Sequence, residues 1–82
     1  MTRKCNGHKN WNHWNVSLWL NNDEGLYRAA LCHLKAAGGS RKRAARSLYY
    51  TLTSETPRIL KTPDGAPYSV TAIYAAMRGL EA

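Results

Sequence analysis

The sequence predicts a single compact all-α domain of four short helices, and three observations support that prediction. Apolar residues repeat at helical spacing in four separate segments. Ser, Asn or Gly residues stand where those segments begin or end, as helix caps do. The chain has 82 residues, the length of one small domain, which buries only about 60% of the surface that its unfolded chain exposes. Each large apolar side chain is therefore expected to matter for stability.

The first helix is predicted from about Asn12 to Asn21, within a block that crowds three Trp and five Asn between positions 10 and 30. Its apolar residues lie nearly all round the helix, which is typical of a central helix. We expect Trp14 and Leu18 to be core residues, because small domains rely on large side chains for burial. Asn15 falls inside an apolar turn, so its amide is expected to tie the chain before this helix, or the link after it, to the core.

The second helix is predicted from about Asp23 to Ala37. Asn21 and Glu24 have the spacing of a capping box, which satisfies free amides at a helix start. Gly38 and Gly39 are expected to end the helix, because Gly adopts the left-handed conformation without a Cβ clash. The buried stripe is predicted to comprise Leu26, Tyr27, Ala30, Leu31 and Leu34.

Ser40 is expected to cap a third helix that reaches about Thr53. Its predicted buried residues are Ala44, Ala45, Leu48, Tyr49 and Leu52. Residues 57–69 carry three Pro and one Gly, and their Pro-Asp-Gly sequence predicts a turn. Arg58 to Lys61 could be extended, but no partner strand is evident. Ser69 is expected to cap a fourth helix from Val70 to about Leu80, with Ile73, Ala76, Met77 and Leu80 buried.

The charge is strongly positive and uneven. The chain has a formal net charge of +7 and a pI of about 9.9, and residues 40–61 carry six basic residues against one acidic residue. Residues 1–10, expected to be a flexible basic N-terminus, lack the apolar core of a signal peptide, and no apolar run approaches the ~20 residues that span a bilayer. We therefore expect a cytoplasmic protein, with no membrane partner and with Cys5 and Cys32 reduced.

No set of residues predicts catalysis, a cofactor or a small-molecule substrate. The Asn side chains do not titrate near neutral pH, so none is suited to general acid or base chemistry. Cys5 and His8 have a C-x-x-H spacing, but no second ligand pair follows, and we predict no metal site. A non-enzymatic protein is therefore expected.

The strongest functional candidate is the segment GGSRKRAARSLYY, residues 38–50. Three basic residues crowd the first turn of a predicted helix, where positive charge opposes the helix dipole, unless an anion binds there. Arg43, Arg46 and Tyr50 follow at i, i+3 and i+7 and predict an exposed edge that contacts nucleic acid or an acidic protein. A solvated basic face is the alternative. The full set of predicted contact residues is Arg41, Lys42, Arg43, Arg46, Tyr50, Arg58 and Lys61.

The segment NWNHWNVSLWLNNDEGLY, residues 10–27, resembles a motif of small uncharacterised proteins of phages, prophages and mobile elements. The matching residues are Asn10, Trp14, Asn15, Val16, Leu18, Trp19, Asn22 and Asp23. Trp11 replaces a Tyr and His13 replaces a Thr of that motif, so Asn12 is expected to cap the first helix in place of the Thr. The resemblance implies an accessory protein that acts by stoichiometric binding in the cytoplasm of a bacterial host cell.

Two functional hypotheses follow. The first is a non-enzymatic, anti-CRISPR-like inhibitor that binds a host defence complex, such as a CRISPR effector, through the basic edge. The second is a DNA- or RNA-binding accessory protein or regulator that contacts nucleic acid directly. A helix-turn-helix formed by the third and fourth helices is disfavoured, because the thirteen residues 57–69 far exceed the usual turn of about three or four.

Overall fold

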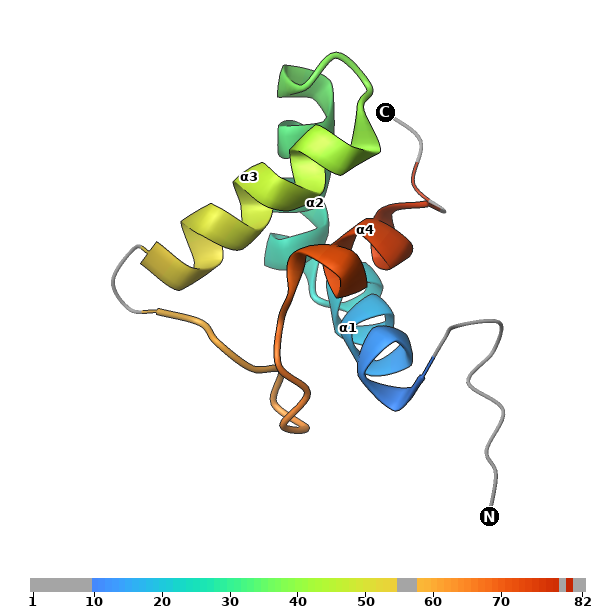
Figure 1. Ribbon diagram of the computed structural model, residues 1–82, viewed down its shortest axis with the longest axis vertical. Helices are drawn as coiled ribbons and strands as arrows, with labels where there is room; N and C mark the ends of the chain where they lie inside the picture. The colour runs from blue at the N-terminus through green and yellow to red at the C-terminus, as the bar shows by residue number, and fades with distance from the viewer. Residues whose placement is uncertain (1–9, 55–57, 79, 81–82) are drawn as a thin grey trace.

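The computed structural model describes residues 10–54, 58–78 and 80, and it is a small all-α domain. The helices are α1 (Trp11–Asn22), α2 (Glu24–Ala36), α3 (Arg41–Ser54) and α4 (Val70–Met77). α1 packs against α2 and α4, and α3 packs against the same two helices. The four helices therefore close around one core (Figure 1), and the predicted fold class is confirmed.

α1 begins one residue earlier than predicted. The Oδ1 atom of Asn10 accepts a hydrogen bond from the His13 N–H at 3.0 Å, so Asn10 caps the helix and Asn12 lies inside it. The rest of the predicted N-terminal segment, including Cys5 and His8, lies outside the described residues.

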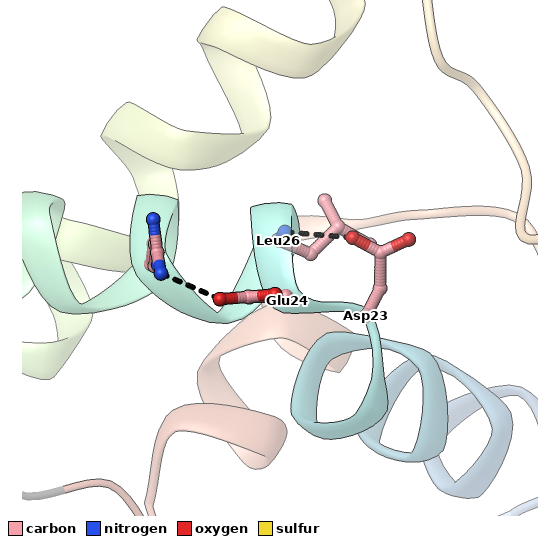
Figure 2. Close-up of polar contacts among 4 residues, drawn as sticks. Asp23, Glu24 and Leu26 are labelled. Carbon is pink, nitrogen blue, oxygen red and sulfur yellow. Dashed lines mark hydrogen bonds and ion pairs between the residues drawn. The ribbon is translucent and has the colours of Figure 1, made fainter.

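Asp23 joins α1 to α2 without a loop. Its backbone N–H donates to the Trp19 carbonyl at 2.9 Å, and its Oδ1 atom accepts from the Leu26 N–H at 3.0 Å (Figure 2). The predicted capping box of Asn21 and Glu24 is wrong, because α1 continues past Asn21 and leaves Asp23 as the residue directly before α2. One aspartate thus ends one helix and starts the next.

α2 ends in the glycine turn that the sequence predicts. Gly38 and Gly39 have φ angles of 67° and 88°, in the left-handed region. The Gly39 N–H donates to the Leu34 carbonyl at 2.9 Å and the Gly38 N–H donates to the Lys35 carbonyl at 3.0 Å. These two bonds form a Schellman motif. Ser40 then caps α3 as predicted, so a link of four residues, fixed by hydrogen bonds, separates the two helices.

The core lies where the four helices meet. Leu48 and Ile73 are fully buried, as predicted, and Leu31 packs against the core while partly exposed. Small residues of α2, α3 and α4 let these helices approach closely. The buried residues of the helices include Val16, Leu20, Ala30, Leu34, Ala44, Ala45, Leu48, Leu52, Ala72, Ile73, Ala76 and Met77.

Trp14 and Leu18 are not core residues, contrary to the prediction. Both are only partly buried, whereas Val16 and Leu20 of the same helix are fully buried. Apolar residues surround most of α1, so helical spacing alone cannot identify its inner face. The contacts of α1 with α2 and α4 determine which face is buried. Tyr27, predicted on the buried stripe of α2, is 38% exposed.

The Pro-rich link between α3 and α4 folds into a tight hairpin. Lys61 and Pro67 form an isolated antiparallel bridge, and the Thr62 N–H donates to the Ala66 carbonyl at 2.8 Å. Gly65, with a φ angle of 95°, lies in the predicted turn. The extended residues before the turn therefore pair with the second half of the same link, a partner that the sequence analysis did not identify.

α4 begins where the sequence predicts and ends earlier. The Oγ atom of Ser69 accepts from the Ala72 N–H at 3.1 Å and caps the helix. The helix ends at Met77, three residues before the predicted end, although Leu80 is buried as expected. None of the helices in the described residues combines the length and the apolar character needed to cross a bilayer.

Candidate functional site

Four of the predicted contact residues form one exposed row on α3, which we call the basic edge: Lys42, Arg43, Arg46 and Tyr50. The row lies opposite the buried side of the helix, and Tyr50 is 71% exposed. No acidic residue occupies the first turn of α3. In the described part of the chain, no carboxylate pairs with the three cations of the basic edge. Their charges are therefore available to a partner.

Arg41 has a different role from the predicted one. Its Nε atom donates to the Met77 carbonyl at 2.8 Å, and its Nη2 atom donates to the Leu80 carbonyl. These carbonyls lie at and just beyond the C-terminal end of α4, where a cation counters the negative end of the helix dipole. One of the three bases crowded at the start of α3 is thus used to hold α4.

Arg58 and Lys61 are exposed but do not belong to the basic edge. They lie on the link between α3 and α4, which begins beside the last turn of α3, where the Ile59 N–H donates to the Leu52 carbonyl at 2.8 Å. Lys42, Arg43 and Arg46 lie in the first half of α3. The predicted contact set therefore divides into an α3 group and a link group.

A groove of about 550 Å³ opens beside the junction of α1 and α2. Its walls are mostly apolar, and Asp23 and Lys61 are its charged lining residues. Burial, followed by the charge of Asp23, raises the pKa of the Tyr68 phenol, another lining group, above its ordinary value. The groove could not be predicted from the sequence, because its lining comes from four separate segments that only the fold brings together.

A polar network beside this groove ties the link to α1. The buried Asn15 donates through Nδ2 to Asp64 Oδ2 at 2.9 Å and accepts at Oδ1 from Thr62 Oγ1 at 2.6 Å. Trp19 Nε1 donates to the same Asp64 oxygen at 2.9 Å, and Thr62 Oγ1 accepts from the Ala66 N–H at 3.0 Å. The bonds from Asn15 and then Trp19 lower the pKa of Asp64 below its ordinary value.

The network explains why a buried amide stands in an apolar helix. Asn15 has the structural role that the sequence predicts, but it holds the Pro-rich link rather than the chain before α1 or the residues between α1 and α2. Trp19 of the same helix binds the link through Asp64. Asn15 and Trp19 therefore support the scaffold.

The described acidic side chains lie away from the basic edge. Asp23 and Glu24 stand at the start of α2, and Glu24 pairs with Arg28 at 2.5 Å, the contact drawn beside Asp23 in Figure 2. Asp64 binds α1. Because α2 has 13 residues, roughly 20 Å of helix separates its acidic start from the glycine turn that leads into α3. Asp23 and Glu24 are therefore separated from the start of α3 by the length of α2.

Among residues 10–54, 58–78 and 80, no three His, Cys, Asp or Glu side chains lie close enough to hold a metal ion. Cys32 is an exposed free thiol, and the neighbouring His33 makes a hydrogen bond with Ser47 that joins α2 to α3.

Comparison with known proteins identifies the family. No curated protein and no solved structure is significantly similar to the chain. A family model described as "Family of unknown function (DUF7249)" matches residues 1–81 and thus includes all four helices. The chain therefore belongs to DUF7249, a family whose function is unknown.

Proposed function

We propose that this protein is a non-enzymatic nucleic-acid-binding protein and that its basic edge contacts the phosphate backbone. The observation that supports this proposal is the exposure of Lys42, Arg43 and Arg46 on one side of α3, with no carboxylate partner in the described residues. Lys and Arg side chains supply most backbone contacts in nucleic-acid complexes. Tyr50 extends the row and offers a hydroxyl for a phosphate or a ring for an unpaired base.

The sign of the charge favours nucleic acid over a protein surface that handles nucleic acid. Such a surface is itself basic, because it must neutralise phosphates, and it would repel the basic edge. The phosphate backbone offers opposite charge along its whole length. Three cations that each neutralise one phosphate predict a slope of about −2.7 for log affinity against log salt on duplex DNA.

A charge-reversal pair provides the test. Arg43→Glu with Arg46→Glu should abolish binding to labelled DNA in a fluorescence anisotropy titration at low salt, while the melting curve changes little because exposed charges contribute little to stability. Arg58→Glu with Lys61→Glu changes the total charge by the same amount and should retain most of the binding. Equal losses in both variants would show that net charge, rather than the basic edge, determines the affinity.

A second candidate is an anti-CRISPR-like inhibitor that binds a host defence complex. The resemblance of residues 10–27 to proteins of phages and mobile elements favours this candidate. On grounds of charge, such an inhibitor would use the basic edge on an acidic patch or on nucleic acid within the complex. Affinity capture from a host lysate separates the two functions: direct nucleic-acid binding predicts that nuclease removes the captured material, whereas a protein-directed inhibitor retains its complex after nuclease treatment.

A further inference from the structure

We infer that α2 and α3 form a helix-turn-helix and that the basic edge enters the major groove of duplex DNA. This inference rests on the proposed function and specifies its ligand. In that motif, two helices cross at a turn of about three or four residues that often contains Gly, and the second helix lies in the major groove. α2 and α3 are joined by four residues, two of them Gly, and they cross in Figure 1 and pack together. The motif thus falls on α2 and α3, not on α3 and α4.

The turn holds the two helices in one arrangement. The hydrogen bonds of Gly38 and Gly39 fix the end of α2, and the cap by Ser40 fixes the start of α3. His33 and Ser47 bond across the two helices further along α3. A fixed α2–α3 pair can present α3 to DNA without an ordering cost at the turn.

The dimensions of the basic edge fit the major groove. An α-helix with side chains is about 10–12 Å wide, and the major groove of B-DNA is about 12 Å wide. From Lys42 to Tyr50 the helix rises about 12 Å, which corresponds to three or four base pairs at about 3.4 Å each. Arg43 and Arg46 lie in the first half of α3, the part of a second helix that enters the major groove, where long basic side chains also reach the phosphates that flank the groove.

The acidic start of α2 fixes which end of that helix approaches DNA. Asp23 and Glu24 would be repelled by phosphates, so this end must point away from the duplex. Lys35, exposed in the last turn of α2, lies at the turn end and is the α2 residue placed for a backbone contact. The C-terminal turn of α2 is therefore the part of that helix that contacts a phosphate.

The first test compares the affinity of the protein for three forms of duplex nucleic acid. The probes are one duplex DNA, the RNA duplex of the same sequence, and the same DNA with bulky glucosyl groups on its cytosines, which occupy the major groove. Binding should be at least about tenfold weaker for the RNA duplex, whose major groove is too deep and narrow for side chains to enter, and at least about tenfold weaker for the glucosylated DNA. A minor-groove competitor, netropsin, should leave the affinity unchanged.

The outcomes distinguish failure of the major-groove inference from failure of the proposed nucleic-acid binding. Equal affinity for the RNA duplex and for glucosylated DNA would overturn the major-groove inference while leaving nucleic-acid binding intact. Absence of binding to every nucleic acid would overturn both. Lys35→Glu should weaken duplex binding and lower the slope of log affinity against log salt by about one. Glu24→Gln, at the far end of α2, should change neither the affinity nor the slope. The reverse result would overturn the assigned orientation.

Discussion

Replacing Thr62 by Val should strongly destabilise the domain, although the two side chains are almost the same size. Thr62 is 4% exposed. Its hydroxyl donates to Asn15 Oδ1 at 2.6 Å and accepts from the Ala66 N–H at 3.0 Å. Val removes both bonds and leaves two buried polar groups without these partners. Each unsatisfied group costs about 1–3 kcal/mol, so the free energy of unfolding should fall by roughly 2–6 kcal/mol. A domain of this size should then lose roughly 8 °C or more in Tm.

The assay is thermal and urea unfolding followed by far-UV circular dichroism. Thr53→Val is the matched control, because its hydroxyl donates only to the Tyr49 carbonyl of its own helix, and its Tm should change little. Adding Asn15→Leu to Thr62→Val should cost less than the sum of the two single changes, because the first substitution already removes the partner of the second. A Thr62→Val protein that melts within about 2 °C of the original would refute the view that this network holds the link on α1.

Three further predictions concern the core and the two perturbed groups. Leu20→Ala should lower the free energy of unfolding by about 2–5 kcal/mol, and Trp14→Ala by less, as chemical denaturation can show; a larger loss at Trp14 would place the core on the wrong face of α1. Because the pKa of Asp64 is lowered, stability should fall as pH drops below about 4, and Asp64→Asn should flatten this acid dependence in melting curves. Because the pKa of Tyr68 is raised from 10.0, stability should fall as pH rises above that value, and Tyr68→Phe should reduce the loss. Unchanged pH profiles would contradict both assignments.

Some helix boundaries could be predicted because their signals are local. The left-handed Gly38 and the caps by Ser40 and Ser69 depend on residues within one turn of the chain. The cap of α2 was assigned wrongly because Asn21, Asn22 and Asp23 are all good capping residues. Only the point at which α1 ends decides among them, and that point is set by packing.

The inner face of α1 and the groove could not be predicted for a different reason. Trp14, Val16 and Leu20 are all apolar, so the pattern has no polar side that marks the outside. Asn15 was recognised as structural, yet its partners Thr62 and Asp64 are 47 and 49 residues away in sequence. A single sequence carries no signal for a contact at that separation.

The helical period places residues that are neighbours in sequence on different sides of α3. Each step along α3 turns the side chain by about 100°, so Arg41 reaches the end of α4 while Lys42 and Arg43 point away from the core. The basic run is therefore one structural arginine followed by two cations that pair with no carboxylate of the described residues, with Arg46 completing the row. Asn15 and Trp19, in contrast, bind the link. Under the proposed function, relatives that keep Asn15 and Trp19 but lack exposed bases at the start of α3 should keep this scaffold and lose nucleic-acid binding.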